Sequence, residues 1–161
     1  MDKAVLDSSI LLKAIFKPLR SLTTDIYERE METHRKCRKI VDLIDEKEIE
    51  ASIPRCCIVE MAAVSRRLSD RATARKISTR LQESYEIAEE ALLFDMALII
   101  ATDTGCSGFD SYFIALAKVK KAKLLTDDNG MQHHGKEAGV DAVLVRDTSN
   151  EEIERLFLHS F

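Results

Sequence analysis

Four acidic residues occupy positions where a carboxylate does more than hydrate a surface. Asp7 directly follows a short apolar run, and Asp128 follows another apolar run with one residue between. Glu60 lies inside the apolar segment 56–64, where an unpaired buried acid is energetically costly. Asp110 opens a predicted helix and has mostly apolar neighbours in the sequence. These placements single out the four carboxylates as candidates for a shared site.

Carboxylates that share a site without basic partners repel one another, and a hard divalent cation with oxygen ligands is the usual remedy. Histidine and cysteine are absent from this set of residues, which disfavours zinc. A cation held by carboxylates polarises phosphoryl oxygens and generates hydroxide for in-line attack on phosphorus. The residue types therefore predict an Mg²⁺ or Mn²⁺ site suited to phosphoryl chemistry.

The elements that must bring these acids together are strands that alternate with helices. Short apolar runs predict strands at 3–7, 49–53, 85–88, 123–126 and 142–145. Between and after them, periodic or capped segments predict helices at 10–16, 23–48, 54–68, 70–83, 91–104, 109–122 and 131–138, and a last helix opened by the capping box Ser149–Glu152. This alternation predicts an α/β fold, a three-layer α/β/α sandwich around a mainly parallel five-stranded sheet. Ligands of such sheets bind beyond the carboxyl ends of the strands, where Asp7, Asp127 and Asp128 are expected.

The chain of 161 residues predicts one domain over residues 1–161. Its net charge of −4 argues against a protein that coats nucleic acid through bulk charge, so any phosphate contact must be local. The longest apolar stretch, 91–101, is interrupted by Asp95 and is too short to span a membrane. The N-terminus lacks the pattern of a signal peptide, and we therefore expect a cytoplasmic protein without a membrane segment.

The order of these motifs resembles that of the PIN-domain ribonucleases, especially the VapC-like toxins. The matching segments are Val5-Leu6-Asp7-Ser8-Ser9, Ile58-Val59-Glu60-Met61, Gly108 to Ala117, and Leu124-Leu125-Thr126-Asp127-Asp128. They extend over positions 5 to 128, which is most of the chain. The helix that precedes a strand ending in Thr-x-Asp makes the set fairly specific.

The resemblance implies a metal-dependent endoribonuclease with a PIN-like fold. Asp7, Glu60, Asp110 and Asp128 would surround one or two Mg²⁺ or Mn²⁺ ions, and Ser9 and Thr126 would hold the acids in place. The Thr-x-Asp spacing favours Asp128 over the adjacent Asp127 as the fourth ligand. The resemblance also implies a homodimer and a small antitoxin protein as partner, and it makes the charged helix at about 23–48 an insert relative to the compact toxins.

Each acid also has a structural explanation. Asp7 could cap the first helix, Asp110 could interact with a helix dipole, and Glu60 could pair with Lys13, Arg66 or Arg67. The corresponding alternative function is a catalytically silent PIN-like scaffold that binds RNA or protein. A haloacid-dehalogenase-like phosphatase is disfavoured, since the second Asp that it needs is missing after Asp7.

Two further groups of residues carry weaker signals. The basic residues Arg66, Arg67, Arg71 and Arg75 face only one nearby acid, Asp70, and form the best candidate contact with an RNA backbone, although a solvated charged face is a slightly better explanation. His133 and His134 could bind a metal or a phosphate. Because adjacent positions on a helix point apart, we expect them to form a solvated pair.

Overall fold

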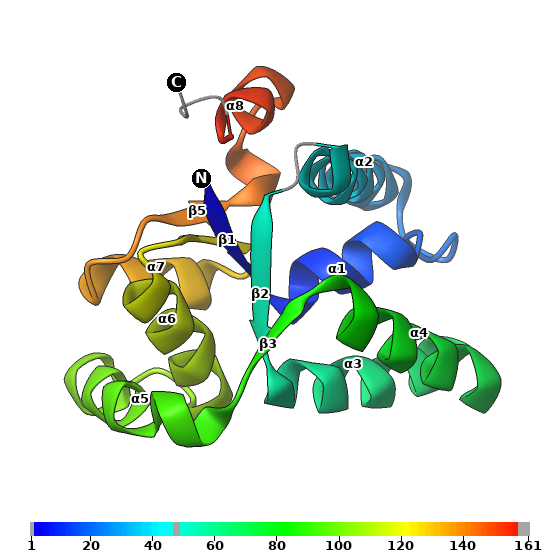
Figure 1. Ribbon diagram of the computed structural model, residues 1–161. Coiled ribbons are helices and arrows are strands. Elements are labelled where there is room, and N and C mark those ends of the chain that lie inside the picture. Colours follow the sequence, from blue (N-terminus) through cyan, green and yellow to red (C-terminus); the bar gives the residue numbers. More distant parts are fainter. Residues whose placement is uncertain (1, 47–48, 158–161) are drawn as a thin grey trace.

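The computed structural model describes residues 2–46 and 49–157, and its centre is one five-stranded sheet (Figure 1). The strands lie in the order β3-β2-β1-β4-β5, and every neighbouring pair is parallel. They are β1 (Lys3–Leu6), β2 (Glu50–Pro54), β3 (Glu86–Ala88), β4 (Lys123–Thr126) and β5 (Ala142–Leu144). Because all strands run the same way, their carboxyl ends meet at one edge of the sheet.

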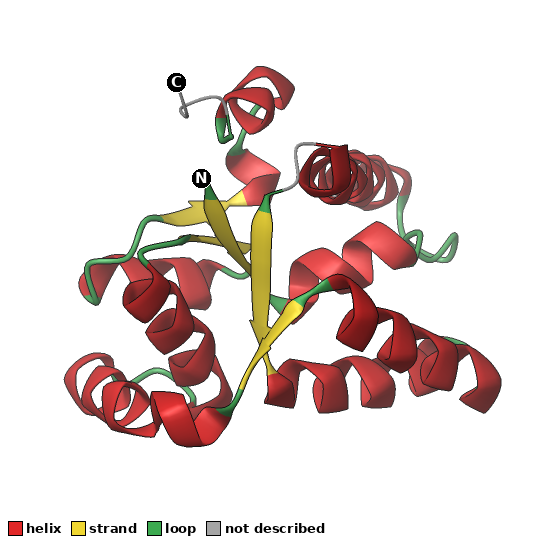
Figure 2. Cartoon of the chain, viewed as in Figure 1, coloured by secondary structure: helices red, strands yellow, loops and turns green. Residues whose placement is uncertain are grey.

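Helices cover both faces of this sheet (Figure 2). On one side lie α1 (Ser8–Ile15), α2 (Thr24–Glu46), α3 (Arg55–Leu68) and α4 (Arg71–Ser84), and on the other α5 (Glu90–Thr104), α6 (Gly108–Lys120) and α7 (Asn129–Glu137). A 3₁₀ turn, η1 (Val145–Asp147), and α8 (Asn150–Arg155) follow β5 and pack near α2. The predicted three-layer α/β/α architecture is therefore confirmed.

The helix boundaries follow from local side chains. The Asp70, Ser107 and Asp128 side chains each accept a hydrogen bond from a backbone N–H in the first turn of α4, α6 and α7. Ser149 and Glu152 form the predicted capping box of α8. Gly105 ends α5 with φ of 71°, a left-handed conformation that costs glycine nothing. The chain is thereby turned back sharply between α5 and α6, and Asp110 is delivered to the first turn of α6.

The long helix predicted at 23–48 is α2, and its final residues 47 and 48 lie outside the described part of the chain. It is part of the helical layer rather than an appendage, because Cys37, Ile40 and Ile44 are buried in the common core. This burial and its contacts to α1, η1 and α8 make α2 an outer helix of the layer that α1 and α3 begin on that face of the sheet.

Within the described residues, no single helix is long and apolar enough to cross a membrane. Only α5 and α6 taken together reach the required length and hydropathy, and the two are bent by 116° at the break between them. Four residues of α6 from Phe113 to Leu116 are fully or almost fully buried against the sheet, so the apolar character of this helix is that of a core element.

Candidate active site at the carboxyl edge of the sheet

Asp7 is the most deeply buried of the four predicted acids, with 6% of its surface exposed. It follows β1 directly and occupies the N-cap position of α1, but its side chain makes no capping hydrogen bond. Instead, its Oδ2 accepts hydrogen bonds from Ser9 Oγ at 2.6 Å and Thr126 Oγ1 at 2.7 Å. With the Ser8 hydroxyl donating a longer hydrogen bond of 3.4 Å to Oδ1, the structure places Asp7 as a carboxylate fixed by hydroxyl groups rather than as a helix cap.

The same two hydroxyl groups join the ends of β1 and β4. Ser9 Oγ accepts a hydrogen bond from the backbone N–H of Asp127, and Thr126 Oγ1 accepts one from that of Asp128, both at 3.0 Å. Since each hydroxyl accepts from an amide, its own proton is directed to Asp7. Ser9 and Thr126 therefore hold Asp7 and the start of the β4–α7 turn in one fixed arrangement.

Adjacent acids at the end of β4 have different environments. The side chain of Asp127 has no exposed surface and pairs with Lys13 Nζ at 2.5 Å and with Arg146 Nε at 3.1 Å. Asp128 is exposed, and its Oδ1 accepts a hydrogen bond of 2.8 Å from Met131 N. Asp127 is therefore committed to two internal cations, whereas Asp128 remains open to solvent at the edge of the sheet.

The pKa values of Asp7 and Asp110 are both raised, in part by the negative charge of other acids at this edge. The pKa of Asp110 is raised chiefly by burial and then by the negative charge of Asp7, with smaller contributions from Asp128 and Glu60. Burial also raises the pKa of Asp7, with Asp128 adding to it, although the hydrogen bonds from Ser9 and Thr126 act in the opposite direction. The fold has brought together acids from β1, α3, α6 and the end of β4.

Glu60 and Asp110 come to this edge on helices. Glu60 lies in the second turn of α3 and is half-buried, so it is more accessible than its apolar sequence surroundings suggest. None of the basic partners considered for it forms an ion pair with it among the described residues, and Lys13 is occupied by Glu30 and Asp127. The structural explanation of Glu60 as half of an ion pair is therefore wrong for this structure.

The donor set at this edge suits a hard divalent cation. It consists of carboxylates, and the ion pairs of the described residues leave Asp7, Glu60, Asp110 and Asp128 without a basic partner. In the same residues, no three of these acids bring oxygens within 4.8 Å of one another. A bound Mg²⁺ would therefore keep water molecules between itself and some of the acids, which is its usual behaviour in proteins.

A different cluster was missed by the sequence analysis. His133 and His134 do not point apart, because a ring nitrogen of each lies within 3.5 Å of the carboxylate of Glu137. The expectation that the two side chains point apart is wrong, since both rings turn toward a third side chain one turn further along α7, although His133 remains exposed to solvent. The spacing His-His-x-x-Glu is the sequence signal that could have indicated this cluster.

The fold and the acidic edge together define a class of protein. The family model described as PIN domain matches residues 4–137. The chain belongs to the PIN-domain family, whose members are typically nucleases and usually bind divalent metals.

Solved structures support the fold. In the crystal structure of PAE2754 from Pyrobaculum aerophilum, the protein shares 19% sequence identity with this chain. The structural match covers 98% of this chain and 98% of that one, with a TM-score of 0.59. The crystal structure of FitAcB from Neisseria gonorrhoeae is also 19% identical, covers 86% of this chain and 95% of its own, and gives a TM-score of 0.52. A comparison with curated protein sequences finds no significant match.

Proposed function

We propose that this PIN-domain protein is an Mg²⁺- or Mn²⁺-dependent endoribonuclease. The observation that carries the proposal is the gathering of Asp7, Glu60, Asp110 and Asp128 at one edge of the sheet, close enough for the other three to raise the pKa of Asp110. Carboxylates in this arrangement lose their mutual repulsion when a divalent cation binds. The proposal assigns all four side chains to the metal.

Side chains and helix termini of the protein hold the proposed metal ligands in position. Ser9 and Thr126 fix the orientation of Asp7, and the N-terminal turns of α6 and α7 position Asp110 and Asp128. A bound divalent cation would supply Lewis acidity toward a phosphoryl oxygen and lower the pKa of a water molecule. The resemblance to the ribonucleases makes an RNA phosphodiester the substrate.

Arginines on α3 and α4 provide a candidate path for the RNA backbone. Arg66, Arg71 and Arg75 line a groove between the two helices, whereas Arg67 lies outside it. Arg67 follows Glu60 by seven residues and so lies on the same face of α3, about 10 Å further along the helix. None of the four arginines forms an ion pair among the described residues, which leaves all of them available to phosphates.

The test of the proposal is cleavage of single-stranded RNA by purified protein with Mg²⁺ or Mn²⁺. Asp110→Asn should reduce the rate by about 100-fold or more because the charge that attracts the metal is lost. Asp103→Asn is the matched control, since Asp103 is an exposed acid near the end of the neighbouring helix α5. Circular dichroism should show both variants folded.

Each outcome of this experiment discriminates. Equal cleavage by wild type and Asp110→Asn would identify a contaminating nuclease and refute the proposed site. Tight RNA binding by wild type without cleavage in either metal would favour the alternative, a silent RNA-binding scaffold.

We also propose that the protein is a homodimer assembled through α5. Leu92, Phe94, Leu98 and Ile99 on this helix are 84%, 53%, 56% and 54% exposed. So many large apolar side chains on one exposed helix are unusual for a monomer. Leu98→Glu should convert the dimer to a monomer in sedimentation experiments, and Gln82→Glu at an exposed position of α4, away from this helix, should not.

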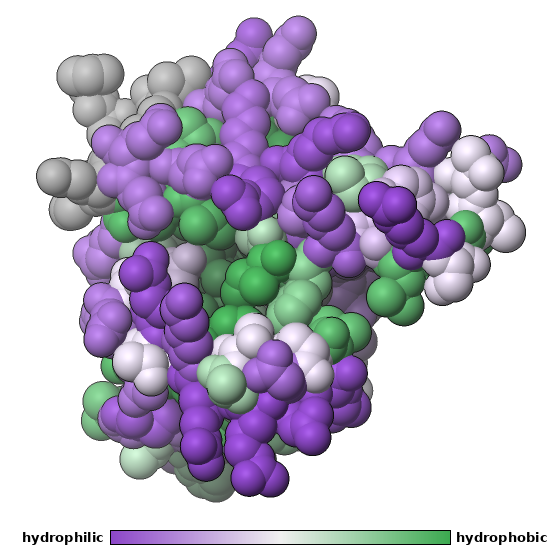
Figure 3. All heavy atoms as spheres, turned by 90° about the vertical axis from the view of Figure 1, so that its right-hand side faces the viewer, coloured by the Kyte–Doolittle hydropathy of each residue, from purple (hydrophilic) through white to green (hydrophobic). Residues whose placement is uncertain are grey.

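The resemblance to VapC-like toxins makes a small antitoxin the proposed protein partner. Figure 3 shows a face on which apolar side chains gather in a hollow surrounded by hydrophilic ones. A pocket of about 410 Å³ lies between α1, α2 and α4, with an apolar floor that includes Leu11, Ile77 and Leu81. An amphipathic helix is the type of segment that such a surface accommodates.

The test of this partner is genetic and biochemical. A small protein encoded by an overlapping reading frame that inhibits RNA cleavage would support the antitoxin, and the absence of such a frame would favour an RNA-processing enzyme.

A further inference from the structure

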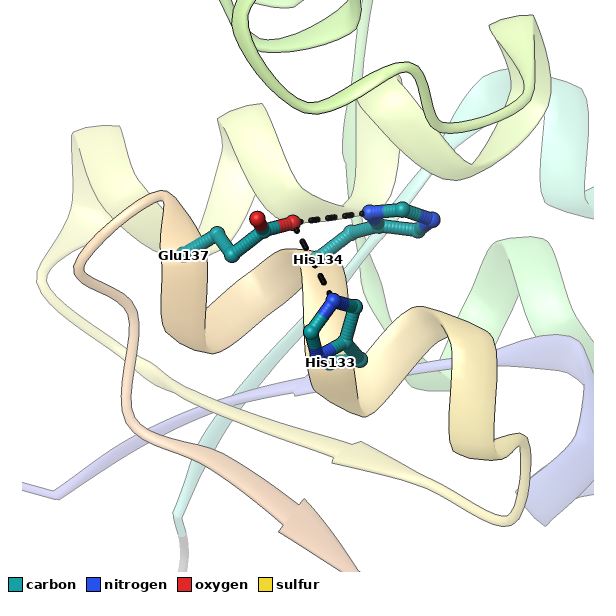
Figure 4. A group of neighbouring side chains, drawn as sticks. All are labelled: His133, His134 and Glu137. Carbon is teal, nitrogen blue, oxygen red and sulfur yellow. Dashed lines mark hydrogen bonds and ion pairs between the residues drawn. The ribbon is translucent and has the colours of Figure 1, made fainter.

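A cluster of three metal-ligating side chains lies on α7, apart from the carboxylates that the proposed nuclease uses. His133 Nε2 and His134 Nδ1 lie 3.5 Å and 3.1 Å from the same oxygen, Oε2 of Glu137 (Figure 4). One ligand atom from each residue lies within 4.8 Å of the other two. Among the described residues, this is the one group of three or more possible ligands that meets so closely.

These separations match the dimensions of a zinc site. Two ligands that are each about 2.1 Å from a tetrahedral Zn²⁺ ion lie about 3.4 Å apart. The two nitrogen–oxygen distances in the cluster are within a few tenths of an ångström of that edge length. An ion could therefore replace these two contacts, and the two imidazole nitrogens, which lie within 4.8 Å of each other, can close on it by rotation of their side chains.

The donor atoms also select the ion. Two imidazole nitrogens and one carboxylate oxygen are the protein ligands of one common type of zinc site. Hard cations such as Mg²⁺ prefer oxygen ligands throughout, and the carboxylates at the edge of the sheet already offer those. The two clusters thus differ in the class of metal that they favour.

We propose that His133, His134 and Glu137 form a second metal site, which binds one Zn²⁺ ion or a similar transition-metal ion. The side chain of His133 is 71% exposed and that of Glu137 47%, so an ion can enter from solvent. His134, at 25% exposed, is the most protected of the three ligands. The remaining coordination position is open to water.

Ion binding at this site joins two consecutive turns of α7. The helix begins at Asn129, directly after Asp128, whose side chain caps it. A ligand that binds only the folded helix stabilises the folded state by mass action. Zn²⁺ should consequently raise the melting temperature of the protein in proportion to the logarithm of its concentration.

The experiment is a calorimetric titration of the full chain with ZnCl₂ in an Asp7→Asn/Asp110→Asn background, which removes binding at the carboxylate edge. We expect one equivalent of Zn²⁺ that excess MgCl₂ does not displace. His133→Asn and His134→Asn should each weaken binding by at least about 10-fold. Lys136→Ala is the matched control on the same helix and should leave the affinity unchanged.

A second measurement identifies the ligands directly. Co²⁺ bound to the same background should show a ligand-field spectrum that His134→Asn abolishes and Lys136→Ala preserves. Because Cys56 is partly exposed, a Cys56→Ser variant tests the competing thiol ligand. Absence of Zn²⁺ binding, or binding that survives both histidine substitutions, would overturn the proposal. RNA cleavage in Mg²⁺ is measured separately, so failure of the zinc site leaves the proposed nuclease activity standing.

Discussion

Asp127 and Asp128 are consecutive residues, yet they belong to two opposite kinds of acidic site. Asp127 is surrounded by the protein's own cations, because Lys13 from α1 and Arg146 from η1 both pair with its buried carboxylate. Asp128 faces Asp7, Glu60 and Asp110 across the edge of the sheet, where the charges on these acids raise the pKa of Asp110. Two adjacent residues thus belong to a neutralised cluster and to a cluster of unbalanced negative charge.

The comparison shows how an acid's environment separates a structural role from a binding role. Lys13 also pairs with Glu30, so the Asp127 cluster joins α1, α2, β4 and η1 and completes its own charge balance. The carboxylates around Asp7 have polar neighbours but no cation among the described residues. The first cluster is neutralised by the protein's own cations, and the second fits the divalent cation that we propose.

Replacement of Asp127 should have the largest effect on stability. Asp127→Asn leaves Lys13 and Arg146 without their shared carboxylate, and we expect a loss of about 3 kcal/mol in the free energy of unfolding. Urea denaturation measures this loss. Asp128→Asn is the matched control, since it keeps an N-capping side chain and breaks no ion pair, and it should change stability by less than about 0.5 kcal/mol. Equal effects of the two substitutions would erase the distinction between the clusters.

Removal of the Thr126 hydroxyl, which links the ends of β1 and β4, should have the next largest effect. The property that it changes is the affinity for metal. Thr126→Val removes the hydrogen bond to Asp7 and the acceptor for the backbone N–H of Asp128. Loss of such a supporting contact typically weakens metal binding by about 10- to 100-fold. Mn²⁺ titration followed by electron paramagnetic resonance measures the affinity.

The control for this substitution is Thr33→Val. Thr33 is also buried, but its hydroxyl donates only to the carbonyl of Arg29 within α2. Its replacement should cost some stability and leave the Mn²⁺ affinity unchanged. A similar loss of affinity in both variants would indicate a general disturbance of the fold rather than a role for Thr126 in holding Asp7.

The smallest expected effect concerns pH. The pKa of Asp110 in the folded protein is raised above its usual value of 3.8, chiefly by burial and then by Asp7. Below pH 3.8 the carboxyl of Asp110 is protonated in both the folded and the unfolded protein, and its contribution to the free energy of unfolding is fully present. As pH rises through the raised pKa, the folded protein has to ionise a carboxyl group that it holds more firmly protonated, and this contribution is lost. At pH 7 without metal, Asp110→Asn should consequently have a higher melting temperature than wild type, and the difference should shrink below pH 3.8.

Addition of Mg²⁺ completes this test. The cation should raise the melting temperature of wild type more than that of Asp110→Asn, because the variant has less charge to be neutralised. Asp103→Asn should behave as wild type in both conditions. A metal-free Asp110→Asn protein that melts below wild type at pH 7 would contradict the view that the acids repel one another.

Much of the architecture was predictable because it is encoded locally. Hydrophobic periodicity and turn residues predicted the order of strands and helices along the chain, and the boundaries of the described elements differ from the predicted ones by one or a few residues. Leu124, Leu125 and Thr126 read as a buried strand and are one. The grouping of His133 and His134 with Glu137 was not predicted, because the His-His-x-x-Glu spacing makes these contacts possible and the side-chain rotamers decide whether they form.

The sequence by itself determined which residues stand at the ends of the strands, since hydrophobic runs and capping residues act over a few positions. It also supplied the four acids, from four segments of the chain. Only the tertiary structure decided that Lys13 and Arg146 reach Asp127 and that no such cation reaches Asp7 among the described residues. The reason is that charge pairing depends on distances between side chains more than 100 positions apart in sequence, as for Lys13 and Asp127, and packing of the helices around the sheet sets those distances.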